Sequence, residues 1–243
     1  MKQNFFNLKM DVTTASGVLS VCRHYFSSKG TRCLFFLNAH CFNVAQKNIT
    51  YRDVLNHCDL LLNDGIGIKL ASRLRGIRLK ENLNGTDLIP MIINLAEELQ
   101  ISVFLLGGKE HVPERAAWML RSSNLNLQIA GWHSGYFSTD ENVEILRRIN
   151  DSGAGLLILG MGVPRQEIWA SGNKDKLRNV KLIIGGGAIL DFISGEVRRA
   201  PVWLRKISME WAYRLYLEPR RLWKRYIIGN NVFFFHVFRL MLN

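Results

Sequence analysis

Short apolar runs alternate along the chain with segments whose apolar residues recur at helical spacing. The apolar residues of segment 18–26 fall on one helical face, and so do Val143, Leu146 and Ile149. Such alternation is typical of a mostly parallel sheet covered by helices. We therefore predict an α/β fold with a Rossmann-like, mostly parallel sheet flanked by helices. The expected strands cover residues 33–37, 59–62, 103–106, 127–130, 156–159 and 182–184.

The composition changes near Glu196, where glycine-punctuated sequence gives way to a basic, aromatic segment. From Glu196 to Asn243 there are ten Lys or Arg residues against three Asp or Glu, so this segment carries much of the chain's formal charge of +12. We predict an α/β catalytic domain over residues 1–195 and a basic, aromatic, membrane-associating helical appendage over residues 196–243.

The appendage combines cations with Trp and Tyr, which suits an anionic membrane surface because rings of this kind lie at the boundary between water and acyl chains. Packing of an amphipathic helix pair on its own domain explains the same residues equally well. The apolar stretch 226–242 is interrupted by polar residues, which excludes a spanning helix. The start of the chain lacks the pattern of a signal peptide. We therefore expect a cytoplasmic protein that is peripheral on the inner face of the plasma membrane.

Polar or glycine residues follow each expected strand, and in open α/β sheets ligands bind beyond the carboxyl ends of the strands. None of these turns matches a P-loop or a dinucleotide-binding fingerprint. The four cysteines form no C-x-x-C pair, which favours reduced thiols over a zinc site. The strand-end residues are Asn38, 63–65, 107–109, 131–132, 160–162 and 185–187.

Several motifs in order resemble the bacterial WecG/TagA/CpsF glycosyltransferases from about Asn38 to Arg225. The resemblance implies an inverting, metal-independent transfer of a sugar, either of N-acetylmannosamine type or a hexose, without a cofactor. The donor would be a UDP-sugar and the acceptor a polyprenyl-diphosphate-linked saccharide in cell-surface polysaccharide biosynthesis. No Asp-x-Asp occurs in the chain, which agrees with metal independence. The motifs are Asn63-Asp64-Gly65-Ile66-Gly67, Asn84-Gly85-Thr86-Asp87, Leu106 to Lys109, Gly135-Tyr136-Phe137, Gly162 to Glu167, Gly186-Gly187-Ala188, Arg199-Ala200-Pro201 and Leu217 to Arg221.

The resemblance makes Asp64 the general base, although a turn or helix cap is the commoner fate of an aspartate followed by glycine. The leaving UDP needs positive charge, and two sources are open. One is the set of backbone N–H groups of the turn 185–187 at a helix N-terminus. The other is a group of arginines that match family cations thought to close over the site, unless they form a solvated basic face. These catalytic arginines are Arg214, Arg221 and Arg225.

Further residues are expected to bind the substrates. Thr86 and Asp87 either hold donor hydroxyls or cap the helix that they open. Tyr136 either stacks on uracil or is a buried strand residue. Phe36 stands where the family often has threonine. The complete expected set of substrate-binding residues is Asn38, Thr86, Asp87, Lys109, Gly135, Tyr136, Gln166, Glu167, Gly186, Gly187, Asp191 and Lys224.

Two other classes of protein compete with this interpretation. A nucleic-acid-binding module would explain the isoelectric point of about 9.8 but not the polar strand ends, so we expect no nucleic acid partner. A peripheral membrane scaffold without catalysis would explain why Phe36 stands in place of the family's frequent threonine, but not the presence of Asp64 and Gln166. Assembly into a homo-oligomer is left open by the sequence.

Overall fold

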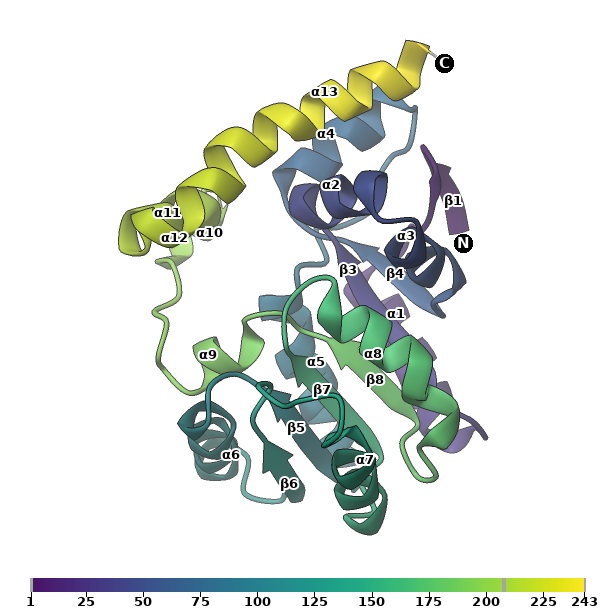
Figure 1. Cartoon of the computed structure of the whole chain (residues 1–243), viewed down its shortest axis with the longest axis vertical. Coiled ribbons are helices and arrows are strands. Elements are labelled where there is room, and N and C mark those ends of the chain that lie inside the picture. Colours follow the sequence, from purple (N-terminus) through teal and green to yellow (C-terminus); the bar gives the residue numbers. More distant parts are fainter. Residues whose placement is uncertain (1, 207–208, 243) are drawn as a thin grey trace.

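The protein is built around an eight-stranded sheet. Figure 1 shows this sheet surrounded by helices in the computed structural model. The structure describes residues 2–206 and 209–242. The strand order is β1-β2-β4-β3-β8-β7-β5-β6, and every neighbouring pair is parallel except β1 with β2. The prediction of a mostly parallel sheet is therefore confirmed. The strands are β1 (Lys2–Phe5), β2 (Leu8–Asp11), β3 (Arg32–Leu37), β4 (Leu60–Asn63), β5 (Val103–Gly107), β6 (Ile129–His133), β7 (Leu156–Gly160) and β8 (Leu182–Gly185).

Helices cover both faces of the sheet, because successive strand residues point to opposite sides. Leu34 and Phe36 enter one apolar core, whereas Cys33, Phe35 and Leu37 enter the other. The first core is closed by α1 (Ala15–Ser27), α5 (Gly85–Glu98), α6 (His111–Ser123) and α9 (Ile189–Ile193). The second is closed by α2 (Ala39–Lys47), α3 (Ile49–His57), α4 (Ile66–Leu74), α7 (Asn142–Asp151) and α8 (Arg165–Asn173), and a short 3-10 turn (Lys174–Lys176) follows α8.

The sequence did not predict the antiparallel hairpin of β1 and β2, whose strands are short and rich in polar residues. Tertiary contacts hold this hairpin on the sheet. The carboxylate of Asp11 accepts a hydrogen bond from the N–H of Leu61 at 3.0 Å, which joins β2 to β4. The strand expected at residues 127–130 lies later, at Ile129–His133, because the segment before it is a turn.

The described part of the C-terminal segment is mainly helical from Val202 onward, as predicted, and its last helix returns to the α/β core. Phe233 of α13 packs edge to face on Phe42 with ring centroids 5.3 Å apart. The side-chain amide of Asn43 donates to the carbonyl of Gly229 at 2.7 Å. Figure 1 shows α13 running across one end of the molecule, beside α2 and α4. The elements are α10 (Val202–Lys206), α11 (Glu210–Leu217), α12 (Pro219–Trp223), a π-helical turn (Lys224–Ile228) and α13 (Gly229–Leu242).

Phe233 and Val237 are fully buried in the same core cluster as Phe35 of β3. The division into residues 1–195 and 196–243 stays a prediction, since shared burial does not establish how the segments fold. Within the described ranges, no helix combines the length and the apolar character that crossing a membrane requires.

Candidate active site

A cavity of about 950 Å³ lies beyond the carboxyl ends of the parallel strands and under the C-terminal helices. Its wall includes the residues that follow β3, β4, β5, β7 and β8, as well as side chains from α11, α12 and α13. Every residue that the sequence predicts for the site lines this cavity, with the exception of Lys224. The fold thus brings together motifs that are far apart in the chain.

Asn38 and Asp64 lie side by side because β3 and β4 are parallel and in register. Leu37 pairs with Asn63, so the next residue of each strand emerges at the same height. Asn38 is the N-cap of α2, and its side-chain oxygen accepts from the N–H of Cys41 at 3.0 Å. This bond turns the amide nitrogen of Asn38 toward Asp64, to which it donates at 3.3 Å. A helix cap therefore orients the neighbour of the predicted base.

Burial raises the pKa of Asp64 to about 6, while the hydrogen bond from Asn38 and the charges of Arg225 and Arg214 act in the opposite direction. The carboxylate still faces the cavity that it lines. The alternative role as a helix cap is excluded, since Gly65 is the N-cap of α4 and has a φ of +86°. Asp64 thus combines access to the cavity with a basicity suited to proton transfer near neutral pH.

Gln166 and Glu167 form a buried pair at the start of α8. The side-chain oxygen of Gln166 accepts from the N–H of Gly187 at 3.1 Å, and its nitrogen donates to Glu167 at 2.7 Å. Burial raises the pKa of Glu167 to about 7. The second carboxyl oxygen of Glu167 is buried without a hydrogen-bond partner among the described residues. These contacts fix the orientation of the Gln166 amide, which lines the cavity.

The turn after β8 is not a free anion site. The N–H of Gly186 donates to the carbonyl of Leu159 at 2.8 Å, and that of Gly187 donates to Gln166. Both groups are occupied inside the protein, and α9 has only five residues, too few for a strong helix dipole. The expectation that N–H groups of this turn receive the diphosphate is therefore wrong for Gly186 and Gly187, although both glycines line the cavity.

The predicted arginines differ in how many of their donors are free. Arg221 forms an ion pair with Glu218, to which its terminal nitrogen donates at 2.7 Å. Arg214 lies over the ring of Phe192, 5.1 Å from its centroid. The Nε atoms of Arg214 and Arg225 are buried and have no hydrogen-bond partner in the described part of the chain. These two arginines retain donors for an anion in the cavity.

Lys224 does not belong to the cavity wall. Its side chain is exposed, and its ammonium group lies over the ring of Trp223 at 5.7 Å from the centroid. Arg221 and Arg225 are four residues apart and both reach the cavity, whereas Lys224 lies beside them on the helix surface. The prediction that Lys224 contacts substrate is therefore not supported by its position.

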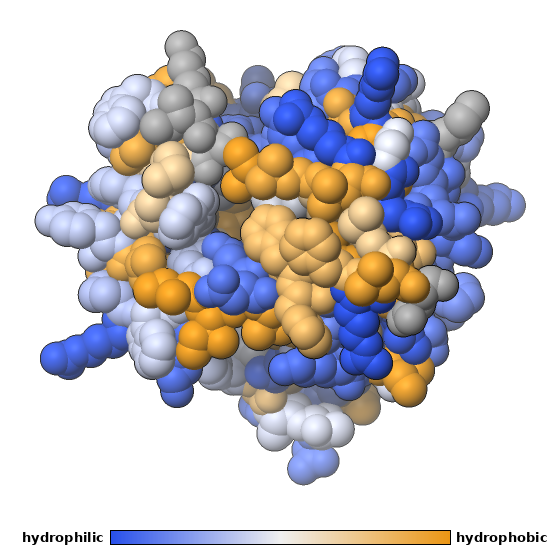
Figure 2. Space-filling model, turned by 90° about the horizontal axis from the view of Figure 1, so that it is seen from above, coloured by the Kyte–Doolittle hydropathy of each residue, from blue (hydrophilic) through white to orange (hydrophobic). Residues whose placement is uncertain are grey.

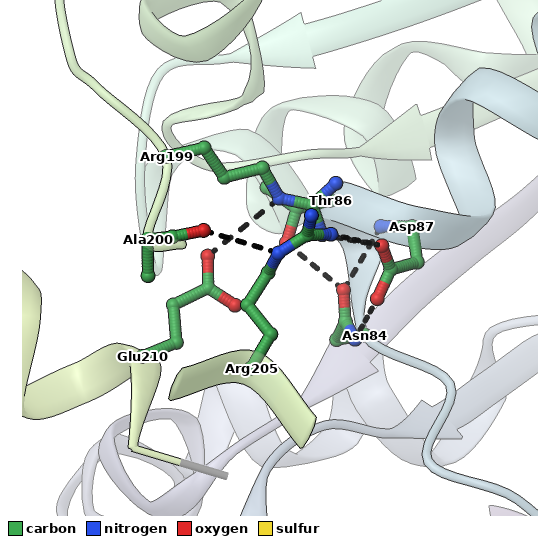
Figure 3. Close-up of polar contacts among 7 residues, drawn as sticks. All are labelled: Asn84, Thr86, Asp87, Arg199, Ala200, Arg205 and Glu210. Carbon is green, nitrogen blue, oxygen red and sulfur yellow. Dashed lines mark hydrogen bonds and ion pairs between the residues drawn. The ribbon is translucent and has the colours of Figure 1, made fainter. Parts of the chain in front are cut away.

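Asn84, and not Thr86, caps α5. The side-chain oxygen of Asn84 accepts from the N–H of Asp87 at 2.9 Å, and Thr86 donates its hydroxyl to the same oxygen at 2.9 Å. Figure 3 shows the guanidinium groups of Arg199 and Arg205 converging on the carboxylate of Asp87. The structure thus gives Asp87 ion-pair partners from the C-terminal segment.

The remaining predicted residues lie on the rim and wall of the cavity. Tyr136 is 73% exposed, so the alternative of a buried strand residue is wrong and its ring is free to stack. The N–H of Gly135 donates to the carbonyl of Gly108 at 2.9 Å, which holds this loop against the end of β5. Burial raises the pKa of Asp191, and the charge of Arg221 opposes that rise. Lys109 lies in the loop after β5.

Sequence reasoning missed several ionisable residues of the cavity, among them Glu210 and His40. Glu210 lines the cavity and lies 3.8 Å from the Nε of Arg199 (Figure 3). No local pattern marks this pairing. His40 also lines the cavity, and burial together with the charge of Arg225 lowers its pKa to about 4. Its position two residues after Asn38, beyond a strand end, was the available signal.

A metal site was not expected from the sequence. In residues 2–206 and 209–242, no three His, Cys, Asp or Glu side chains group as ligands for an ion. Metal independence nevertheless stays a prediction.

Comparison with known proteins identifies the class of protein as a glycosyltransferase. Residues 3–243 match the family described as Glycosyl transferase WecG/TagA/CpsF. The chain is 32% identical over 203 residues to an N-acetylglucosaminyldiphosphoundecaprenol N-acetyl-beta-D-mannosaminyltransferase of Bacillus subtilis (strain 168), a match that covers 84% of this chain and 78% of that protein. A protein of the same name from Staphylococcus aureus (strain MRSA252) is 27% identical over 226 residues, covering 92% and 86% respectively. The chain belongs to the WecG/TagA/CpsF family, which confirms the resemblance inferred from its motifs.

Asp87→Asn is expected to loosen the C-terminal segment, because it removes the charge that pairs with Arg199 and Arg205. Partly exposed ion pairs contribute less than about 1 kcal/mol each, so amide hydrogen exchange in α10 and α11 should rise roughly 3- to 10-fold. Glu98→Gln is the control, since it removes an exposed pair with Arg23 elsewhere. Equal exchange in wild type and Asp87→Asn would contradict this role.

Glu167→Gln is expected to stabilise the protein more at high pH than at low pH. Burial raises the pKa of Glu167 to about 7 in the folded protein. The contribution of this group to the free energy of unfolding therefore falls as the pH rises from the pKa of the unfolded chain to about 7. Glutamine keeps an acceptor for Gln166 and cannot ionise. Urea unfolding should show a relative gain of up to about 3 kcal/mol at about pH 8 compared with about pH 4. The exposed Glu114→Gln serves as control, and an identical pH dependence of wild type and Glu167→Gln would refute the assignment.

Proposed function

We propose that the protein transfers a sugar from a UDP-sugar to a saccharide carried on polyprenyl diphosphate, in the biosynthesis of a cell-surface polysaccharide. The observation that carries this proposal is the carboxylate of Asp64, which is oriented by Asn38 in a cavity that also holds arginines. The names of the two relatives support a lipid-diphosphate acceptor. They also favour an N-acetylmannosamine-type donor over a hexose.

The reaction that we propose is a single displacement. Asp64 accepts the proton of the acceptor hydroxyl while its oxygen attacks the anomeric carbon of the donor. The bond between that carbon and the diphosphate oxygen breaks, and UDP leaves with the electron pair. Attack opposite to the leaving group inverts the anomeric configuration, and no metal is required if protein cations stabilise the diphosphate.

Arg214 and Arg225 are the cations best placed for the leaving diphosphate. Both side chains line the cavity, and their Nε atoms have no hydrogen-bond partner among the described residues. Charge-assisted hydrogen bonds to phosphate are about twice as strong as neutral ones. Arg221 either gives up its ion pair with Glu218 to bind phosphate or acts while that ion pair stays intact. The Gln166 amide, fixed by Glu167 and Gly187, is suited to orient the donor.

We propose further that the protein binds to the cytoplasmic face of the plasma membrane. Large apolar side chains of α10 to α13 are exposed, among them Trp203, Tyr216, Ile227 and Phe238. Figure 2 shows apolar side chains gathered with hydrophilic ones on the end of the molecule where α13 lies. An anionic bilayer would cover the apolar groups and neutralise the neighbouring cations.

The two competing classes explain less of the site. A nucleic-acid-binding module accounts for the basic charge, yet acidic groups such as Asp64, Glu167 and Asp191 line the cavity. A non-catalytic scaffold leaves the orientation of Asp64 by Asn38 without a purpose. Phe36 packs against Gly85, where a Cβ atom would lie 3.3 Å from its ring, so the departure from threonine has a packing role.

Asp64→Asn is expected to lower kcat roughly 100- to 10,000-fold with little change in donor binding, since asparagine cannot accept the proton. Wild-type kcat/KM should rise with pH through about 6 as the carboxylate ionises. The assay measures UDP release from a panel of UDP-sugars with a polyprenyl-diphosphate-linked acceptor, in EDTA. Equal turnover by Asp64→Asn would exclude Asp64 as the base. Absence of acceptor-dependent release with every donor would argue against the transferase itself.

Arg225→Gln and Lys224→Gln form a matched pair that tests which cations act on the diphosphate. Arg225 lines the cavity, so its loss should lower kcat roughly 100-fold or more. Lys224 is exposed outside the cavity, so Lys224→Gln should keep near wild-type kcat with a detergent-solubilised acceptor. Comparable losses of kcat in both variants would show that the total positive charge of the segment, and not the position of the cation, determines activity.

A further inference from the structure

Helix α4 exposes an apolar stripe that belongs to the α/β part of the chain and not to the C-terminal segment. Ile66, Leu70 and Leu74 are 39%, 42% and 48% exposed and follow one another at intervals of four residues, so they lie on one helical face. The opposite side of α4 is buried through Ile68 and Ala71. Among the described residues, this stripe is therefore left partly open to water.

Three cations lie beside this stripe. Lys69, Arg73 and Arg78 line one surface pocket together with Ile77 and Leu79. No ion pair found within residues 2–206 and 209–242 involves any of these three cations. Exposed cations next to an apolar stripe are the composition that binds an anionic phospholipid surface, because head groups meet the charges and acyl chains meet the apolar residues.

The stripe connects two parts of the molecule. Ile66 and Leu70 also line the active-site cavity, so the stripe starts at the cavity mouth and runs outward to Leu74. At Gly67, α4 contacts α13, because a Cβ atom there would lie 3.5 Å from the ring of Phe233. Figure 1 places α4 and α13 at the same end of the molecule, and Figure 2 looks onto that end.

We infer that α4 and the basic residues beside it form a second membrane contact, which binds anionic phospholipid and holds the cavity mouth against the bilayer. This inference rests on the membrane association proposed above, but it assigns binding to a surface outside residues 196–243. A lipid-linked acceptor then reaches the cavity along α4 without leaving the bilayer.

The test is co-sedimentation of the full chain with phosphatidylcholine vesicles, prepared with and without phosphatidylglycerol. Two variants probe α4: Leu74→Glu, and Arg73→Gln combined with Arg78→Gln. With phosphatidylglycerol, the double variant should bind roughly 20- to 30-fold more weakly than wild type, since each cation near an anionic surface raises the affinity about fivefold. Leu74→Glu should bind roughly tenfold more weakly. Thermal unfolding verifies that each variant is folded.

Matched controls carry the same changes at the other end of the sheet. Arg178→Gln with Lys181→Gln removes two cations just before β8, and Leu125→Glu changes an 89% exposed leucine before β6. Both controls should bind like wild type. A loss of binding in the controls equal to that in the α4 variants would overturn the inference, because total charge would then suffice.

Phe238→Glu, on the exposed side of α13, separates this inference from the proposed membrane association. If Phe238→Glu releases the protein while the α4 variants bind like wild type, α4 is not a membrane contact and the proposed association stands. If wild type binds neither kind of vesicle, the proposed membrane association fails together with the inference. Weak binding by the α4 variants beside normal binding by the controls supports the second contact.

Discussion

The parallel register of β3 and β4 is the constraint on which the site depends. Pairing of Leu37 with Asn63 places Asn38 and Asp64 at the same height beyond the sheet. Because Asn38 must also cap α2, its amide can present only its donor to the carboxylate. A shift of one residue would separate the two side chains and would also turn the strand residues to the wrong core. The apolar cores on both faces of the sheet thus determine the geometry of a polar pair at its edge.

The C-terminal segment completes the cavity through contacts of two different kinds. Burial of Phe233 and Val237 anchors α13 by the hydrophobic effect, which acts at all salt concentrations. The ion pairs of Asp87 with Arg199 and Arg205 hold the earlier part of the segment by partly exposed charges, which salt and competing anions weaken. The segment is therefore anchored firmly at its end and held weakly where it crosses the site. Such an arrangement suits a wall that has to admit two substrates.

The sequence was sufficient for most of the parallel strands, which depend on local signals, and, together with the family resemblance, for most of the predicted cavity residues. Apolar runs marked β3, β4, β5, β7 and β8, and the residues after them had to meet at one edge of the sheet. The hairpin of β1 and β2 was missed because its short strands are held by long-range contacts such as that of Asp11 with Leu61. The sequence also did not reveal the ion-pair partners of Asp87 or the acceptors of the Gly186 and Gly187 N–H groups, because these contacts join residues that are distant in the chain. Helical spacing placed Lys224 with Arg221 and Arg225, but it did not reveal which of them face the cavity.

The electrostatics of the cavity link the proposed base to the proposed leaving-group site. Arg225 and Arg214 oppose the rise that burial causes in the pKa of Asp64, and Arg225 also disfavours protonation of His40. A bound diphosphate would neutralise these arginines and so remove the charge that stabilises the carboxylate as an anion. Under the proposed function, donor binding therefore makes Asp64 a stronger base. The same arginines then serve both halves of the displacement: they keep Asp64 ionised in the empty site, and they stabilise UDP once the acceptor proton has been taken.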